Sequence, residues 1–216
     1  MYLPPHFEEN DTDALHRTLR DHPFAALVTN GPQGLDANHI PFDFDFDADA
    51  PPHGRLRAHV ARANPVWQEV PDGSPVLVVF RASNSYVSPN WYPSKHEAHK
   101  QVPTWNYQVV HVHGTVRFTD DDRFLRGVVG RLTRTHEARV ASERPWKMSD
   151  APADYLETML QAIVGVEVTI ERIVGKSKLN QNKEARDRLG AIDGLERQGA
   201  RDVADAMRQA EARRGG

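Results

Sequence analysis

The sequence predicts an α+β fold that is mainly β, an antiparallel barrel or sandwich with added helices. Short apolar runs separated by Gly, Pro and Asn recur through the first 120 residues, whereas amphipathic stretches with helical spacing come mostly later. Strands and helices therefore do not alternate as they do in a parallel sheet. With 216 residues and no cysteine, the chain can bury a core without disulfides, and it has no thiolate metal site or cysteine nucleophile.

The N-terminal part is expected to form one helix followed by a β-hairpin. Apolar residues at helical spacing predict a helix from Asp11 to His22, which Pro23 ends. Residues 24–29 and 35–46 are two strand-like runs around the turn sequence Asn-Gly-Pro-Gln-Gly, which favours a hairpin.

The remaining strands and helices are predicted from the same two signals, short apolar runs for strands and apolar residues at helical spacing for helices. Strands are expected over residues 55–60, 76–80, 107–118 and 163–174, and helices over residues 124–136 and 153–162. The chain from Asn180 is rich in Ala, Arg and Glu and is expected to be helical. The simplest division is a β domain with inserted helices at residues 1–178 and a helical appendage at residues 179–216.

The charge balance and the N-terminus narrow the class of protein. The formal net charge is −3, and residues 171–216 form a mildly basic tail with eleven Lys and Arg against eight Asp and Glu. This excess is too small to predict nucleic-acid binding. The start of the chain does not resemble a signal peptide, and no apolar run is long enough to span a membrane, so a cytoplasmic protein is expected.

Three patterns are similar to metal-binding motifs, and each is incomplete. Phe42, Phe44 and Phe46 alternate with Asp43, Asp45 and Asp47, but a calcium loop needs Gly and Glu where the chain has Ala48 and Gly54. His96 and His99 are one residue short of the metalloprotease helix spacing, and the role of this loop stays open. His111 and His113 would share one face of a strand, yet no third ligand has a recognisable spacing. We therefore expect no metal site.

Polar and aromatic residues gather where the expected strands enter or leave turns. Residues 57–67, 86–92 and 102–107 are rich in Trp, Tyr, Asn, His and Arg. Flat rings beside hydrogen-bonding groups suit a planar, partly polar ligand, although a packed aromatic cluster is an equally good explanation. Arg62 and Asn64, which follow His59, add donors suited to an anion. The chain has neither a Walker-type loop nor the glycine fingerprint of dinucleotide-binding folds, so side chains would have to hold a phosphate.

Nine segments in order make the sequence similar to a known family. They are MYLPPHFEE, PFAALVTN, NHIPFDF, AHVARANPVW, YVSPNWY, VPTWNY, VVHVHGTV, IVGVEVTI and GKSKLNQN. Over residues 1–190 they resemble the PaiB-type family, also called FMN-binding negative transcriptional regulators. The resemblance implies an antiparallel split β-barrel that works as a homodimer, with FMN in a cleft at the subunit interface.

The resemblance also implies which residues bind the cofactor. The flavin ring would lie along the backbone of Asn38, His39, Ile40 and Pro41, and the phosphate would be held near His59, Ala61, Arg62 and Asn64. Bidentate donation from Arg62 to phosphate oxygens is the expected contact. Thr104, Trp105 and Asn106 would reach the ring edge, from the same or the partner subunit. Lys176, Lys178 and Gln181 are further candidates, although a turn lysine is more often simply solvated. Asn180 departs from the family, which tends to have Ser there.

Three functions remain open at this point. In the first, FMN takes electrons from a nicotinamide or another reductant, as in an FMN-dependent oxidoreductase, although the sequence indicates no general acid or base. In the second, FMN is a sensor or a stabilising part of a transcriptional repressor. Direct DNA binding is not favoured, because the arginines of the tail alternate with acidic residues and no helix-turn-helix pattern precedes them. In the third, the protein handles haem, with His111, His113, His96 or His99 as axial ligand.

Overall fold

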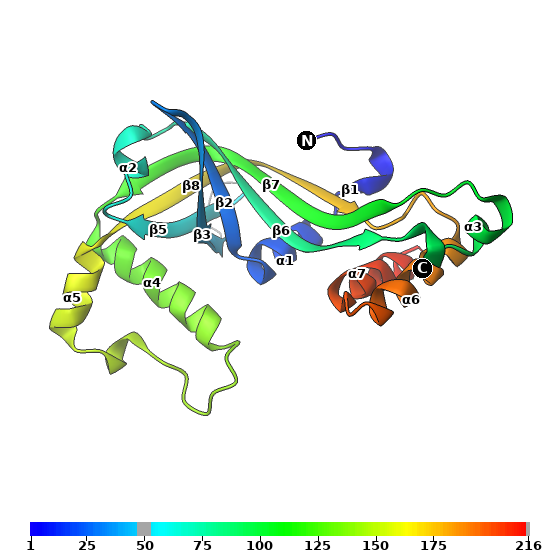
Figure 1. Ribbon diagram of the computed structural model, residues 1–216. Coiled ribbons are helices and arrows are strands. Elements are labelled where there is room, and N and C mark those ends of the chain that lie inside the picture. Colours follow the sequence, from blue (N-terminus) through cyan, green and yellow to red (C-terminus); the bar gives the residue numbers. More distant parts are fainter. Residues whose placement is uncertain (47–52, 215–216) are drawn as a thin grey trace. The chain divides into compact units, whose positions relative to one another are not determined.

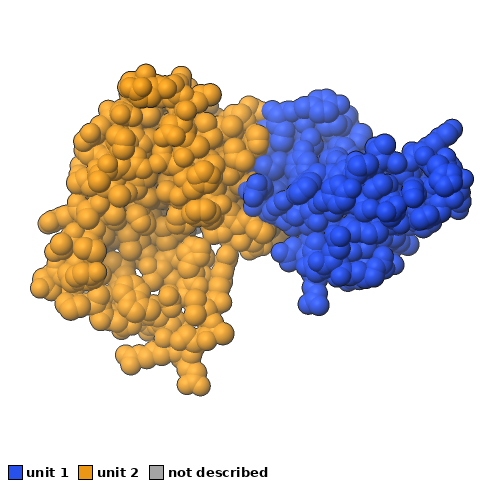
Figure 2. Space-filling model, viewed as in Figure 1, with its two compact units in different colours: residues 1–16, 81–110, 174–216 blue, residues 17–80, 111–173 orange. Residues whose placement is uncertain are grey.

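The computed structural model describes residues 1–46 and 53–214. The chain divides into two compact units (Figure 2). The first unit comprises residues 1–16, 81–110 and 174–216, and the second comprises residues 17–80 and 111–173. Three long strands continue from one unit into the other: β6 (Pro75–Val87), β7 (Thr104–Thr119) and β8 (Ile163–Lys178). The predicted domain boundary at residue 178 stays a prediction.

The second unit is built on a sheet with the strand order β3-β2-β6-β7-β8-β5-β4. Its shorter strands are β2 (Phe24–Gly31), β3 (Gly34–Pro41), β4 (Asp43–Asp45) and β5 (Arg55–Ala61). The pairs β2–β3, β2–β6, β4–β5 and β5–β8 are antiparallel. The expected hairpin is present, with Phe24 opposite Pro41 and Gly31 opposite Gly34.

Residues 35–46 form two strands, not the single strand that the sequence predicts. β3 lies at one end of the strand order and β4 at the other. The break falls at Pro41 and Phe42, because a proline has no N–H for further pairing. The N–H of Phe42 donates instead to the carbonyl of Pro23, at 2.9 Å, and its ring is 2% exposed and packs against Phe80.

Helices cover part of this sheet. The aspartates of β4 form ion pairs with arginines. The helices are α2 (Val66–Glu69), α4 (Asp122–Glu137) and α5 (Ala153–Gln161), and α1 (Thr12–Asp21) begins in the first unit and ends in the second. Asp45 pairs with Arg57, and Asp43 pairs with Arg131 of α4, each at 2.5 Å. Asp47 lies outside the described residues.

The first unit packs two helices against strand ends and short helical turns. η1 (Pro5–Phe7), η2 (Pro89–Trp91) and α3 (Pro93–Ala98) are its short elements, and β1 (Glu8–Glu9) pairs antiparallel with the end of β8. The tail forms α6 (Ala185–Arg197) and α7 (Arg201–Ala212), side by side in Figure 1. They are separate helices because the chain turns at Gly199, whose φ of +78° glycine adopts without strain.

The core of the first unit lies between these helices and β6. Its buried residues are Val87, Tyr92, Leu179, Ala191, Ile192, Leu195, Val203, Ala204 and Met207. Asn180, the position at which the sequence departs from the family, adopts a left-handed φ of 64°, which Asn tolerates better than most residues. Its side-chain amide donates to the Tyr92 hydroxyl at 3.0 Å. Over the described chain, no helix is both long and apolar enough to cross a membrane.

We predict that Gly194→Ala destabilises the protein because a Cβ there would lie 2.2 Å from the ring of Trp91. The expected loss in the free energy of unfolding is about 1–3 kcal/mol, the usual effect of overpacking. The matched control is Gly130→Ala in α4, where the Cβ would meet Met148 at an ordinary 3.6 Å and helix propensity favours alanine. Urea denaturation followed by tryptophan fluorescence measures both variants. Equal stability of the two variants would contradict the packing described here.

Candidate functional site

The second unit contains a pocket of about 600 Å³ between the tip of the β2–β3 hairpin and α2. Figure 1 shows these two elements, β2 and β3 in blue and α2 in cyan. Its lining residues are Thr29, Gly31, Gln33, Gly34, Leu35, Asp36, Asn38, Asn64, Pro65, Val66, Glu69 and Val70. Val66, Val70 and Leu35 give the pocket an apolar wall, and the amides and carboxylates give it a polar one. A cavity of this size and mixed lining is typical of sites for small molecules and cofactors.

Two residues that the resemblance implies for cofactor binding meet in this pocket. The Asn64 side-chain amide donates to Asn38 Oδ1 at 2.6 Å, and Asn64 Oδ1 accepts from the N–H of Val66 at 3.0 Å. These bonds fix both side chains at the start of α2. Asn38 Nδ2, in contrast, is buried and has no hydrogen-bond partner among the described residues. Leaving such a donor unsatisfied costs about 1–3 kcal/mol, so Asn38 presents a hydrogen-bond donor suited to a ligand acceptor.

The other cofactor-binding candidates of the second unit lie on β3 and β5. His39, Ile40 and Pro41 continue β3 beyond Asn38, and the ring of His39 lies 6.3 Å from that of Phe24. Ala61 ends β5. His59 lies two residues earlier on β5, where its Nδ1 is buried with no partner in the described chain. Burial lowers the pKa of His59, because the protonated imidazole loses its hydration.

Arg62 makes a different set of contacts from the one expected for a phosphate ligand. Its Nε donates to the carbonyl of Gln161 at 2.6 Å, and its Nη2 donates to Asp120 at 2.7 Å and to the carbonyl of Ile163 at 3.0 Å. The guanidinium also lies 5.8 Å from the centre of the Trp67 ring. Two of its three nitrogens are thus occupied in joining the end of β5 to the junction of α5 and β8. Phosphate binding by Arg62 stays a prediction.

The other candidates lie in the first unit and have three different surroundings. Lys178 Nζ donates to Thr104 Oγ1 and, at 2.7 Å, to the carbonyl of Trp105. Gln181 closes the turn after β8, because its amide bonds the N–H of Leu179 and the carbonyl of Ser177. Asn106 is completely buried beside Met207 of α7, with its Oδ1 unpartnered in the described chain. Thr104, Trp105 and Lys178 thus form one contact group, which Gln181 and Asn106 do not join.

The histidine pairs show no complete metal site. His111 and His113 lie on one face of β7 with their ring centres 6.4 Å apart, as predicted, and burial lowers the pKa of each. His96 belongs to α3, whereas His99 ends that helix with a left-handed φ of 54°, so the two do not share a helical face. Over residues 1–46 and 53–214, no group of three or more His, Asp or Glu side chains could hold a metal ion.

Sequence reasoning missed most of the pocket wall. Thr29, Gln33, Asp36 and Glu69 line it, and no motif marks them. They meet because the hairpin register brings Thr29 opposite Asp36, and because the turn after β5 directs α2 toward the hairpin tip. The described lining residues include two carboxylates and no Lys, Arg or His.

The chain is similar in sequence to one protein family and in fold to solved structures. The family described as "Putative FMN-binding domain" matches residues 1–172. An Aspergillus fumigatus protein is 34% identical over 92% of each chain, and the Bacillus subtilis "Protease synthase and sporulation protein PAI 2" is 28% identical over 96% of each chain. The solved structure of the FAD and heme binding protein from Mycobacterium smegmatis is 16% identical with a TM-score of 0.53, covering 85% of this chain and 79% of that chain. This last similarity shows the fold alone, an α+β antiparallel sheet of the split-barrel type.

We predict that His59 makes the stability of the protein depend on pH. Its pKa in the folded state is lowered, so the unfolded state binds more protons as the pH falls below the unperturbed value of 6.5. The free energy of unfolding should therefore decrease as the pH falls below 6.5. His59→Gln should reduce this slope, and His22→Gln, which alters an exposed histidine of the same unit, should leave it unchanged. Urea unfolding at several pH values measures the slopes, and equal slopes in all three proteins would contradict the prediction.

Proposed function

Because the chain belongs to the PaiB-type family of FMN-binding domains, we propose that it binds FMN through the pocket of the second unit and acts as a flavin-linked redox or flavin-sensing protein. The observation that supports this most directly is the buried, unpartnered Asn38 Nδ2 on the pocket wall. A flavin ring presents carbonyl oxygens on its pyrimidine edge, and such an oxygen is the acceptor that this donor lacks.

The rest of the pocket fits the ring portion of the cofactor. The apolar side chains of Leu35, Val66 and Val70 exclude water from one side, and the Asn38–Asn64 bond holds the donor in place. Bound flavin supplies hydride and electron transfer, while the protein supplies binding and orientation. The absence of a cationic side chain among the described lining residues means that the FMN phosphate would be held by residues outside this wall.

The proposed homodimer is supported by the surface beside the pocket. β3 ends the strand order of the sheet, and Leu35 on it is 79% exposed. Phe24 on the adjacent β2 is 64% exposed. Leu35 and Phe24 lie at opposite ends of the β2–β3 hairpin, and the strand between them carries polar residues. An exposed edge strand offers unpaired backbone groups to another chain, and here a second copy would lie against Asn38 and His39.

The helical tail does not favour direct DNA recognition. Among its arginines, Arg188 pairs with Glu211, Arg208 with Glu196 and Asp205, and Arg186 with Glu97 and Glu184. Charges neutralised in this way stabilise α6 and α7 and are poor ligands for DNA phosphates. Any link to transcriptional repression would then act through the flavin or a partner.

We predict that Asn38→Ala weakens FMN binding about tenfold, the effect of losing one buried hydrogen bond of roughly 1.4 kcal/mol. Titration of the purified protein with FMN, followed by quenching of flavin fluorescence, gives the affinity. Asn30→Ala is the matched control, because Asn30 is exposed on β2 and does not line the pocket. Equal affinity of wild type and Asn38→Ala would disprove the assignment of this donor.

An absorbance scan of the same samples separates the two cofactor hypotheses. A flavin band that saturates with added FMN supports the proposed function. If titration with haem gives a Soret band and no flavin binds, the proposed function is wrong. The protein would then bind haem, through residues such as His111 or His113.

A further inference from the structure

Three lysines of the first unit lie at the end of β8 and just after it, and the resemblance names two of them, Lys176 and Lys178, as further cofactor candidates. Lys176 and Lys178 are two residues apart on β8 and therefore project from the same face, and Lys183 follows the turn after that strand. Lys176 is 7% exposed, whereas Lys178 and Lys183 are half-buried. Burial of its ammonium group, with the positive charges of Lys176 and Lys183 nearby, lowers the pKa of Lys178. The three charges therefore influence one another.

Each ammonium group contacts neutral groups. Lys176 Nζ donates to the carbonyl of Tyr2 at 3.0 Å and lies over the rings of Tyr2 and Tyr107. Lys178 donates to Thr104 Oγ1 and the carbonyl of Trp105. Lys183 donates to Gln101 Oε1 at 2.6 Å and lies over the ring of Tyr92. Within the described chain, no carboxylate lies at ion-pair distance from any of the three.

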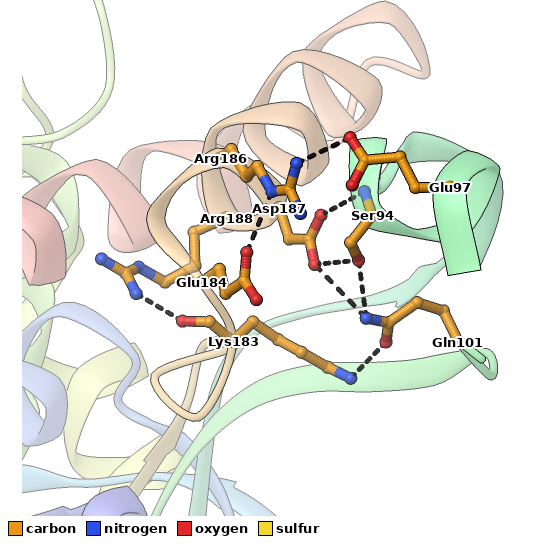
Figure 3. A network of polar contacts seen from close by, with 8 residues as sticks. All are labelled: Ser94, Glu97, Gln101, Lys183, Glu184, Arg186, Asp187 and Arg188. Atoms are coloured by element: carbon orange, nitrogen blue, oxygen red, sulfur yellow. Dashed lines mark hydrogen bonds and ion pairs between the residues drawn. The ribbon is translucent and has the colours of Figure 1, made fainter. Parts of the chain in front are cut away.

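The carboxylates around Lys183 are occupied by other partners (Figure 3). Asp187 is buried and accepts from the N–H and the hydroxyl of Ser94 and from the amide of Gln101. This contact orients Gln101 so that its oxygen faces Lys183. Glu97 and Glu184 both bind Arg186.

Four arginines of the same unit have the counter-charge that the lysines lack. Arg186, Arg188, Arg208 and Arg213 pair with carboxylates. Three clustered cations without a counter-charge are unfavourable, since burial removes hydration and the charges repel. Lysine is a common point-charge ligand for phosphate, and Thr104 adds a hydroxyl beside Lys178. The neighbouring Tyr2 is 84% exposed and Trp105 is half exposed, so solvent reaches the edge of the cluster.

We propose that Lys176, Lys178 and Lys183, with Thr104, form a binding site for a phosphate group. The group is either inorganic phosphate or the phosphate of a monoester such as FMN. The FMN alternative rests on the proposed function, whereas the site itself does not. A phosphate dianion would compensate most of the charge of the three lysines.

We predict that inorganic phosphate binds the wild-type protein saturably. The Lys178→Met and Lys183→Met variants should bind phosphate at least tenfold more weakly than the wild type. Isothermal titration calorimetry at constant ionic strength measures both, because matched salt keeps charge screening equal. Lys100→Met is the control, since it removes the same charge from an exposed position of the same unit. Lys178→Arg keeps the charge and should retain binding. Thermal unfolding identifies any variant that fails to fold.

Titrations with FMN and riboflavin identify the source of the phosphate. If the site holds the phosphate of FMN, Lys178→Met weakens FMN binding at least tenfold, leaves riboflavin binding unchanged, and inorganic phosphate competes with FMN. If it holds free phosphate, FMN binds wild type and variant equally. Absence of saturable phosphate binding to the wild type, or equal phosphate affinity in Lys178→Met, Lys183→Met and Lys100→Met, overturns the proposal. A protein that binds phosphate but no flavin would refute the proposed function and leave this site intact.

Discussion

The three long strands β6, β7 and β8 are neighbours in the sheet and contribute residues to both units, so both units depend on them. Side chains alternate along each strand, so one register fixes which residues are buried in each unit. On β8 this alternation buries Val164, Val166, Val168 and Ile170 in the second unit. The same strand then carries Lys176 and Lys178 in the first unit. A shift by one residue would exchange buried and exposed faces in both units.

The hydrogen-bond partners of polar side chains separate the residues that support the fold from those for which we propose a ligand. Arg62 and Asp187 each have several good partners, and their contacts tie separate segments together. Asn38 retains an unpartnered donor on the wall of a pocket, and Lys178 retains an uncompensated charge. Groups of the second kind persist in folded proteins mainly where function requires them.

Local signals in the sequence predicted much of the fold. α1, β5, α4 and α5 were predicted to within two residues at each end, because caps, proline and apolar periodicity act over short distances. The split of residues 35–46 depends on pairing with distant strands, which periodicity does not encode. The candidate site was predicted unevenly. The resemblance indicated Asn38 and Asn64, but no pattern marked Asp36 or Glu69. Lys176 was named only as a further candidate, and no local pattern predicted its burial.

A crystal structure of the protein grown with FMN would test the central claim most directly. The account predicts that the flavin ring lies in the pocket between the hairpin tip and α2, with a ring carbonyl oxygen accepting from Asn38 Nδ2. A flavin bound away from both Asn38 and Asn64, or a pocket without flavin in crystals grown at saturating FMN, would contradict it.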